Sequence, residues 1–375
     1  MKAILQNQKE RKELENVLSF WATKVIDNDN EGFYGAIDFF GNVNPSANKG
    51  IILNARLLWS FSKVMNELKL TNYKNLAERS YKYIEGFFKD TTDSTVYWEV
   101  YHDGKVKNEN KICLAQSYAL LGISEFYKFS KNEKARTWCY ELFDHIETNF
   151  YNTHDNNYAS QLPVEDDESK NLGTHLHLLE AYTNLYTIDE NEEVKERIKN
   201  LIQLLSDKFL KNPSYCETDF DSEWKTITTH ISYGHNIEVL SILLDASMTI
   251  GDDMYIPFLL ERFNLYFEEI AHIISNNGAV FTTKNLIENS FNDEYDWWVQ
   301  TEIIIGLEKL HKITREKKYT KLSDTLWSLI RESFFDVENG EWHAKLNIEK
   351  KPISTDKVSM WKSPYHIVRM YLYFI

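Results

Sequence analysis

The chain has 375 residues, of which 43% are hydrophobic and 26% are charged, and its formal net charge is −15. This balance is typical of a globular protein with ample material for a core, and the negative charge argues against a nucleic acid partner because it would repel a phosphate backbone. Only 13 glycines and 6 prolines are present, which argues against an all-β or loop-rich chain.

The first stretch, "MKAILQNQKERKELE", runs directly into charged residues and lacks the apolar core of a signal peptide. No uninterrupted apolar stretch has the length of a membrane span. The three cysteines, Cys113, Cys139 and Cys216, show no CxxC spacing and fit reduced thiols. We therefore expect a cytoplasmic protein with no membrane partner.

Helical periodicity recurs along the whole chain and predicts twelve helices. They are expected at residues 8–27, 50–69, 72–90, 110–130, 132–150, 170–188, 190–211, 230–250, 252–275, 295–314, 317–334 and 362–374. The connections after the even-numbered helices are very short, as in "KLT" near residue 70, whereas those after the odd-numbered helices are long. Even-numbered helices thus begin about 60 residues apart, and such a period indicates a repeat architecture.

Six helical hairpins with all long loops on one side predict an all-α (α/α)6 barrel, with residues 1–375 as a single domain. Several long loops carry glycine beside aromatic residues, as in "EGFYGAIDFFG" and "NGEWHAKL", and are expected to form short β-hairpins over one face of the barrel. An α-solenoid binding scaffold is the alternative, but it needs no chemistry at the mouths of the hairpins.

The even-numbered helices carry unusual polar residues in their first two turns. Arg56 lies in the helix at 50–69, His175 and His177 in the helix at 170–188, and His235 and Glu238 in the helix at 230–250. Inner helices that all begin at the long-loop face would bring these side chains to one site.

Two further even-numbered helices open with aromatic residues. Trp297 and Trp298 begin the helix at 295–314, and Trp361 stands five residues before His366 at the start of the helix at 362–374. The adjacent pair points about 100° apart on a helix, so at most one of the two is expected to face the axis squarely.

Each of these residues also has a purely structural interpretation. His175 and His177 are two apart and point to different faces, so only one can face inward, and we choose His177 because it aligns with Glu180. A buried arginine such as Arg56 usually has a carboxylate partner. His343 follows a loop tryptophan but is left among the structural histidines.

Metal and glycosidase chemistry are both weakly indicated. The spacing His235-x-x-Glu238 resembles half of a di-metal carboxylate site, but no second copy of the motif is present. Histidines outnumber candidate inward acids, which favours proton transfer near neutral pH over cleavage between two carboxylates. We therefore expect no metal and no cofactor.

Five stretches in order along the chain carry a family resemblance: "KGIILNARLLWSFS", "THLHLLEAY", "SYGHNIEVLSILLDA", "WWVQTE" and "WKSPYHIVRMYL". On these motifs the sequence resembles the N-acylglucosamine 2-epimerase superfamily and, within it, the cellobiose 2-epimerases. The resemblance implies an (α/α)6 barrel, in agreement with the helical rhythm. It also implies exchange of the proton on C2 of a reducing-end glucose through ring opening and an enediolate, without a cofactor.

The resemblance assigns a role to each candidate residue. His235 and His366 match the two acid/base residues that flank C2, Arg56 matches an arginine near the O1 and O2 oxygens, and His177 matches a histidine that assists at the ring oxygen. Glu238 matches a glutamate that orients the histidine of its own helix, so that a His235–Glu238 contact is expected. The substrate-binding aromatic residues are expected to be Trp297, Trp298, Trp361, Tyr97 and Trp98.

The resulting prediction is an isomerase that converts the reducing-end glucose of β-1,4-linked disaccharides such as cellobiose or lactose to mannose, as a monomer or weak homodimer. The alternatives are a mannose isomerase or N-acylglucosamine 2-epimerase acting on a monosaccharide, an inverting glycoside hydrolase, and a non-catalytic sugar-binding toroid. One departure from the family pattern, Gly173 where asparagine is frequent, bears on the choice of sugar more than on the chemistry.

Overall fold

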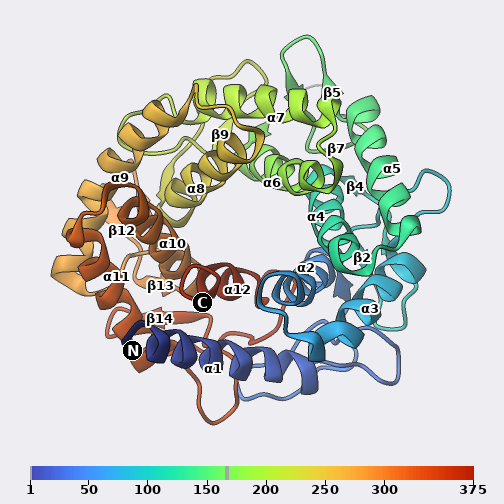
Figure 1. The fold of residues 1–375 in the computed structure, drawn as a ribbon, viewed down its shortest axis with the longest axis horizontal. Helices are drawn as coiled ribbons and strands as arrows, with labels where there is room; N and C mark the ends of the chain where they lie inside the picture. Colours follow the sequence, from blue (N-terminus) through green and yellow to red (C-terminus); the bar gives the residue numbers. More distant parts are fainter. Residues whose placement is uncertain (1, 165–168) are drawn as a thin grey trace.

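The computed structural model describes residues 2–164 and 169–375, which form twelve α-helices arranged as two concentric rings (Figure 1). The outer ring consists of α1 (Lys2–Thr23), α3 (Lys74–Tyr83), α5 (Glu133–Asn149), α7 (Glu192–Leu204), α9 (Ile256–Asn277) and α11 (Lys317–Leu329). The inner ring consists of α2 (Ile51–Leu68), α4 (Cys113–Ser130), α6 (Leu172–Asp189), α8 (Tyr233–Ile250), α10 (Trp297–Thr314) and α12 (Tyr365–Tyr371). The predicted (α/α)6 barrel is confirmed.

The inner ring is closed, because each inner helix packs against the next and α12 packs against α2. Close approach depends on small residues. A Cβ on Gly122 of α4 would come within 2.8 Å of the Ala55 carbonyl oxygen of α2, and one on Gly306 of α10 within 2.4 Å of Ile237 on α8. Inner helices are buried on nearly all sides, which explains why their sequences are apolar around most of the helix.

The outer helices α3, α7 and α11 each continue into one π-helical segment, at Ile84–Phe88, Leu205–Phe209 and Ile330–Phe334. The predicted helix ends agree with the structure to within a few residues except at both chain ends. The last helix was expected at 362–374 but begins only at Tyr365, since Pro364 disfavours helical dihedrals at Ser363.

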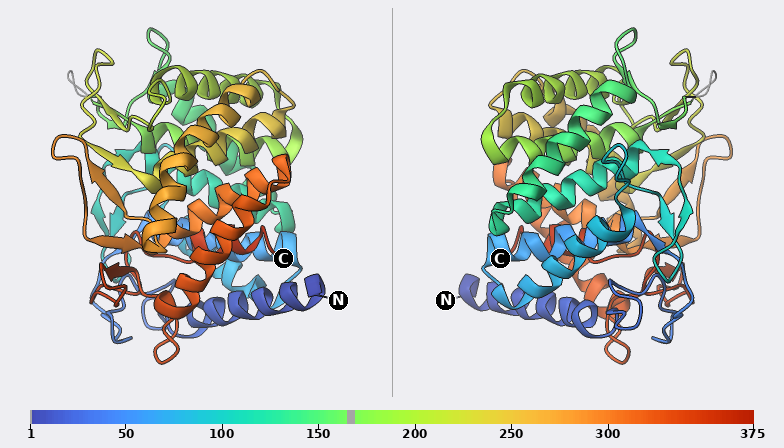
Figure 2. Two further views of the ribbon diagram at one scale, coloured as in Figure 1. Left: turned by 90° about the vertical axis from the view of Figure 1, so that its left-hand side faces the viewer. Right: turned by 90° about the vertical axis from the view of Figure 1, so that its right-hand side faces the viewer.

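The long loops contain short antiparallel strands that lie on one face of the barrel (Figure 2). Three strands that lead directly into inner helices pair with strands of the following loop: β1 (Lys49–Gly50) with β2 (Glu99–Val100), β4 (Lys111–Ile112) with β7 (Gln161–Leu162), and β8 (Lys170–Asn171) with β9 (Asp219–Phe220). Two more follow the same rule: β10 (His230–Ser232) pairs with β11 (Thr283–Asn285), and β13 (Glu294–Asp296) with β14 (Lys345–Asn347). The predicted β-hairpins are therefore present, and they also join neighbouring loops.

Four remaining strands extend these sheets or form a local hairpin. β3 (Val106–Asn108) adds to β2, β12 (Ser290–Phe291) adds to β11, and β5 (Tyr151–Asn152) pairs with β6 (Asn157–Tyr158). A bridge between Ile37 and Val358 joins the first long loop to the last. The loops thus form a continuous collar over the N-terminal ends of the inner helices.

Two ion pairs, one buried and one partly buried, fix the collar to the inner helices. Asp27, just after α1, accepts a hydrogen bond from Lys49 at 2.8 Å, and Lys49 leads into α2. The same arrangement recurs one repeat later, where Asp90 accepts from Lys111 at 2.7 Å just before α4. These contacts set the position at which each inner helix begins.

Contacts of α1 with the segment after α11 and with α12 join the beginning of the barrel to its end. Arg331, just after α11, donates hydrogen bonds to both Glu10 and Glu13 of α1. The Tyr371 hydroxyl of α12 reaches Glu13 at 3.3 Å. None of the helices in residues 2–164 and 169–375 has the length and apolar character that crossing a membrane would require.

Candidate active site

A cavity of about 310 Å³ opens at the collar face, on the barrel axis. Every inner helix contributes to its wall, together with one loop residue. The lining residues are Arg56, Leu114, Tyr118, Gly173, His177, His235, Glu238, Trp297, Trp298, Trp361 and His366. All five predicted catalytic residues and three of the five predicted aromatic residues therefore line this cavity.

His366, the second residue of α12, is held by a carboxylate from the neighbouring helix. Its Nδ1 atom lies 2.7 Å from Oε1 of Glu302 on α10, and Glu302 in turn accepts a hydrogen bond from Arg369 at 3.3 Å. Burial lowers the pKa of His366 to about 4, although Glu302 opposes this shift. The sequence analysis missed Glu302 and Arg369, which lie inside the motifs "WWVQTE" and "HIVRMYL".

His177 belongs to a second network across α4, α6 and α12. Its Nδ1 atom lies 3.1 Å from Oε2 of Glu180, and its Nε2 atom lies 3.0 Å from the Tyr118 hydroxyl. Glu180 also accepts hydrogen bonds from Arg369 and from the Tyr365 hydroxyl. Burial would raise the pKa of Glu180, but Arg369 and His177 outweigh it and hold that pKa at about 2.

His175 faces away from the cavity, as the helical period predicted. Its Nδ1 atom lies 2.8 Å from the Asn171 carbonyl oxygen and its Nε2 atom 2.9 Å from the Asn157 side chain. His343 also lies elsewhere, since its ring stacks on Phe39 at 5.1 Å. The choice of His177 over these histidines as a cavity residue agrees with the structure.

His235 makes no hydrogen bond to any described residue. Burial, helped by the nearby His177 and His366, lowers its pKa to about 4. The expected contact with Glu238 is wrong: no described residue donates to Glu238, and its buried Oε1 atom has no partner. Sharing a helix face brought the two side chains to one cavity, but it did not bring their polar atoms together.

A buried arginine usually has a carboxylate partner, but Arg56 does not. No carboxylate of the described residues lies within ion-pair distance of its guanidinium. Its Nη2 atom donates to the Tyr118 hydroxyl at 2.5 Å, and its Nη1 atom donates to the Trp361 carbonyl oxygen at 3.0 Å. The guanidinium also lies over the rings of Tyr118 and Tyr365. The positive charge thus faces the cavity without a direct counter-ion.

Aromatic rings form the remaining walls. The Trp298 ring centroid lies 5.0 Å from that of His235 and 5.5 Å from that of His366, so this ring contacts both imidazoles. Trp297 lines the cavity as well but is 7% exposed, with Lys362 above its ring. Both tryptophans, which the sequence placed among the candidate substrate-binding residues, therefore line the cavity.

Trp361 stands at the rim of the cavity, 49% exposed, with its ring 6.1 Å from that of Trp98. Trp98 therefore reaches the rim through Trp361. Tyr97 does not reach it: its ring lies under Lys111, which pairs with Asp90 of the collar. Of the predicted pair, Trp98 therefore lies beside the rim of the cavity and Tyr97 does not.

Among the described residues, one group has a spacing that suits a metal ion, with ligand atoms of Glu238, Glu302 and His366 within 4.8 Å of one another. Two of its members already bind each other, and Arg369 presents a positive charge to the same Glu302. A guanidinium at this position opposes a second cation, so the group does not fit a metal site.

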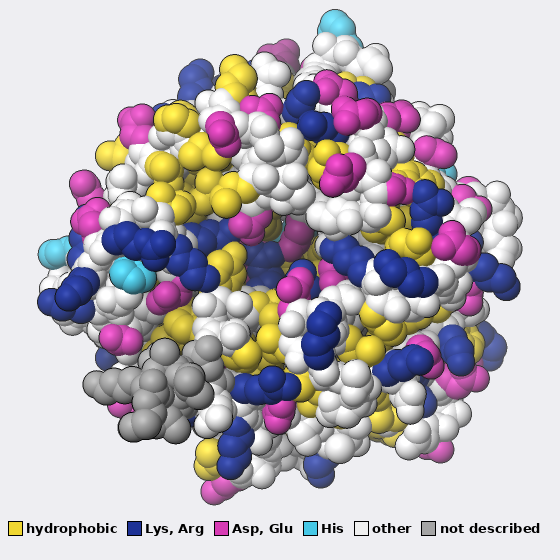
Figure 3. Space-filling model, viewed as in Figure 1, with side chains coloured by type: hydrophobic (Ala, Val, Ile, Leu, Met, Phe, Trp, Pro, Cys, Tyr) yellow, Lys and Arg dark blue, Asp and Glu magenta, His cyan; other side chains and the backbone are white. Residues whose placement is uncertain are grey.

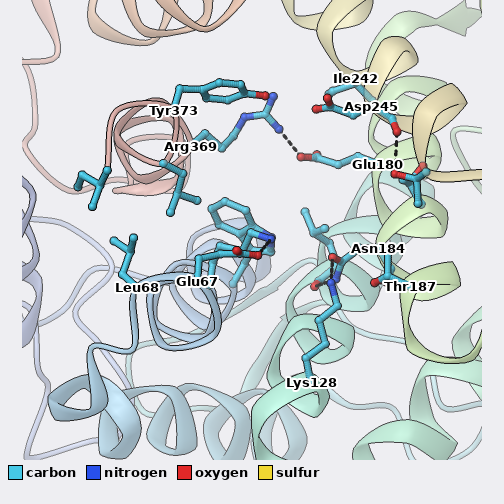
Figure 4. A pocket seen from close by; sticks show the side chains of 17 residues that line it. Glu67, Leu68, Lys128, Glu180, Asn184, Thr187, Ile242, Asp245, Arg369 and Tyr373 are labelled. Carbon is cyan, nitrogen blue, oxygen red and sulfur yellow. Dashed lines mark hydrogen bonds and ion pairs between the residues drawn. The ribbon is translucent and has the colours of Figure 1, made fainter. Parts of the chain in front are cut away.

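A second cavity of about 510 Å³ lies on the axis at the opposite face, where the surface is hollowed among charged side chains (Figure 3). Figure 4 shows Arg369 and Glu180 pointing toward one another at its wall. Because Glu180 also binds His177, this ion pair separates the two cavities. The other charged side chains that line the second cavity are paired as well. Lys128, for example, donates hydrogen bonds to Glu125 and Asn184.

The fold and parts of the sequence are shared with known proteins. A family model described as N-acylglucosamine 2-epimerase matches residues 32–370. The chain is 30% identical to a cellobiose 2-epimerase of Bacteroides fragilis, over 99% of this chain and 98% of that protein.

Two solved structures extend the comparison. The cellobiose 2-epimerase of Bacillus thermoamylovorans superposes with a TM-score of 0.91 at 29% identity, covering 100% of this chain and 99% of the other. A D-mannose isomerase superposes with a TM-score of 0.88 at 18% identity, covering 98% and 97%, and shows the same fold. With a family match over nearly the whole length and the family's motifs gathered around one cavity, the chain belongs to the N-acylglucosamine 2-epimerase family.

Proposed function

We propose that the protein is a sugar 2-epimerase that converts the reducing-end glucose of a β-1,4-linked disaccharide to mannose. One observation carries the proposal: two imidazoles that line the cavity, the partly buried His235 and the buried His366, contact the same tryptophan ring, and the same cavity holds an arginine with no carboxylate partner among the described residues. The names of the similar proteins support the same activity.

The two imidazoles supply the proton transfers. Burial lowers the pKa of both to about 4, so both are uncharged near neutral pH and can accept a proton from carbon. They come from α8 and α12, which flank α10 in the inner ring, and so approach a sugar in the cavity from different directions (Figure 1). Inversion at C2 requires removal of the proton on one face and its replacement on the other.

The partners of the two histidines differ. His366 has the Glu302 carboxylate, which stabilises an imidazolium, whereas His235 has no carboxylate within hydrogen-bond distance. We therefore assign to His235 the role of the neutral base that removes the C2 proton in the direction from glucose to mannose. His366 takes up a proton from solvent, with Glu302 stabilising the imidazolium, and delivers it to the opposite face of C2. His235 then returns its proton to solvent, which restores both neutral imidazoles.

Arg56 stabilises the enediolate in this scheme. A proton next to a carbonyl is weakly acidic, so a base alone is insufficient and the developing oxyanion needs preorganised donors. The uncompensated charge of Arg56 and its fixed position between Tyr118 and the Trp361 carbonyl meet this need. His177, which faces the same cavity, assists at the ring oxygen during ring opening.

Glycosidic cleavage is less well supported. It uses two carboxyl groups on either side of the scissile bond. Among the described glutamates at this cavity and its inner wall, Glu180 and Glu302 are both bound to Arg369, whereas Glu238 has no hydrogen-bond donor. The site therefore offers a proton-transfer pair and lacks a free pair of acids.

The proposal is tested by following the protein with cellobiose, lactose, mannose and N-acetylmannosamine in D2O by carbon and proton NMR. We expect mannose to appear at the reducing end of the disaccharides with deuterium at C2. Preference for free mannose would instead support the isomerase alternative, released glucose a hydrolase, and retention of the original C2 hydrogen a mechanism without proton exchange.

A further inference from the structure

Glu238 is a buried acid without a partner in a cavity where the other acids are paired. It is the sixth residue of α8, its side chain lines the cavity, and the residue is 1% exposed. Its Oε1 atom is buried with no hydrogen bond, and no cation of the described residues lies within 4 Å of the carboxyl group. An ionised carboxylate at this position would lose hydration free energy, and neither a hydrogen bond nor an ion pair would compensate for the loss.

Charged and titratable groups face Glu238 from every inner helix. They are Arg56 of α2, Tyr118 of α4, His177 and Glu180 of α6, His235 of its own helix, Glu302 of α10, and Tyr365, His366 and Arg369 of α12. Arg369 is already shared by Glu180 and Glu302, and Arg56 binds a hydroxyl and a carbonyl. An ionised Glu238 would therefore place three carboxylates against two guanidiniums.

Another acid, Glu302, lies close to Glu238. Oxygen atoms of Glu238 and Glu302 lie within 4.8 Å of each other. Burial and the negative charge of Glu302 raise the pKa of Glu238 well above its ordinary range, and Arg369 and Arg56 oppose the shift without cancelling it. The proton is expected on Glu238 because Glu302 has His366 and Arg369 as donors.

We propose that Glu238 is a neutral carboxylic acid in the resting enzyme and donates a hydrogen bond to the sugar oxygen on which negative charge develops. The proposal rests on the proposed epimerase function. Helices α2 and α8 lie on opposite sides of the barrel axis, so that Arg56 and Glu238 approach this oxygen from opposite directions (Figure 1). An ionised Glu238 would repel the enediolate, whereas a carboxylic acid that stays neutral in an apolar site stabilises an oxyanion.

Three variants test the hydrogen-bond donor: Glu238→Gln, which keeps an N–H donor, Glu238→Leu, which has none, and Glu302→Gln as a matched control. We expect kcat/KM to fall about tenfold in Glu238→Gln and ~10²–10³-fold in Glu238→Leu. If Glu238 acted as an anion, both variants would lose activity equally, and that result would overturn the proposal.

The pH profile separates a catalytic from a structural role. The donor is present below the pKa of Glu238 and is lost as pH rises through it, so the wild type should lose kcat/KM on the alkaline side. This alkaline fall should vanish in Glu238→Gln, which has no proton to lose. It should persist in Glu302→Gln, which keeps Glu238, but move to lower pH, because the negative charge of Glu302 no longer raises the pKa of Glu238. An unchanged alkaline fall in Glu238→Gln contradicts the assignment.

A readout independent of turnover distinguishes this proposal from the proposed function. Infrared difference spectra of wild type minus Glu238→Gln at neutral pH should contain the C=O stretch of a protonated carboxyl group, shifted in D2O and lost at alkaline pH. Absence of this band would overturn the neutral acid even in an active epimerase. A wild type that shows the band but exchanges no C2 proton with any sugar would instead overturn the epimerase proposal.

Discussion

Gly234 lies directly beneath the ring of Trp298, at a distance that leaves no room for a side chain. A Cβ at Gly234 would come within 2.3 Å of the Trp298 Cζ3 atom. Because Trp298 contacts both His235 and His366, the first turn of α8 sets the position of a ring that spans the two imidazoles.

The substitution Gly234→Ala should therefore displace Trp298 and lower kcat/KM by ~10²-fold, because small misplacements of reacting groups are costly. Thermal unfolding should change by less than activity does. Gly86→Ala is the matched control, since a Cβ there meets nothing within 4 Å. Equal activity of the Gly234→Ala and Gly86→Ala variants would show that Trp298 does not position the site.

The dependence of kcat/KM on pH below neutrality should reflect protonation of the two imidazoles, His235 and His366. Burial lowers the pKa of His235 and His366 from 6.5 to about 4, so their neutral forms persist at pH 5. We expect kcat/KM to stay level from pH 7 to pH 5 and to fall below it, with the fold checked by circular dichroism at each pH. A midpoint near 6.5 would mean that the imidazoles are more hydrated than their burial implies.

The same shifts affect stability with a definite sign. Between pH 6.5 and about 4 the unfolded chain binds more protons at these histidines than the folded protein does, so the free energy of unfolding falls as pH falls through this window. Replacing His235 by asparagine should remove part of this pH dependence.

The rim tryptophan should contribute to binding more than to stability. Trp361 is 49% exposed, and Arg56 contacts its backbone carbonyl, which Trp361→Ala retains. We expect an unchanged melting temperature and a roughly tenfold higher KM for cellobiose, ~1.4 kcal/mol, with little change for glucose. Trp297→Ala is the contrasting variant, because truncating a buried tryptophan typically costs about 3–5 kcal/mol of stability. A loss of stability in Trp361→Ala would contradict the role at the rim.

The ion pair between Asp27 and Lys49 should be needed for stability and not for catalysis. Asp27→Ala leaves a buried ammonium without its counter-ion, which typically costs about 3–5 kcal/mol. Urea unfolding would measure this loss, and kcat well below the melting temperature should stay near the wild-type value. Asp103→Ala, which removes a partner from the exposed Lys105, should unfold like the wild type.

Much of the architecture could be predicted from sequence because it depends on local patterns. The helical period located the helices and selected His177 over His175, and loop lengths indicated which helices form the inner ring. The contacts that determine proton affinity join helices distant in the chain, such as Glu302 with His366 and Tyr118 with Arg56. Their spacing in sequence carries no signal.

The errors have the same origin. Glu238 was assigned to His235 because the two residues are neighbours on one helix, whereas the partner available to a buried histidine is decided by the opposite wall. Tyr97 was expected to bind the substrate together with Trp98, but its ring lies under Lys111 in the collar. Both errors concern side-chain direction, which depends on tertiary packing.

Closure of the ring by the last helix has a consequence for synthesis on the ribosome. Arg369 is the shared counter-ion of Glu180 and Glu302, and it belongs to α12, the helix that follows all the other helices of the barrel in the chain. A nascent chain that has completed α10 carries both acids without their guanidinium and without His366. We therefore expect the axis to remain hydrated until α12 has been synthesised and packed, and chains stopped before α12 to expose acidic interiors that quality-control proteases can recognise.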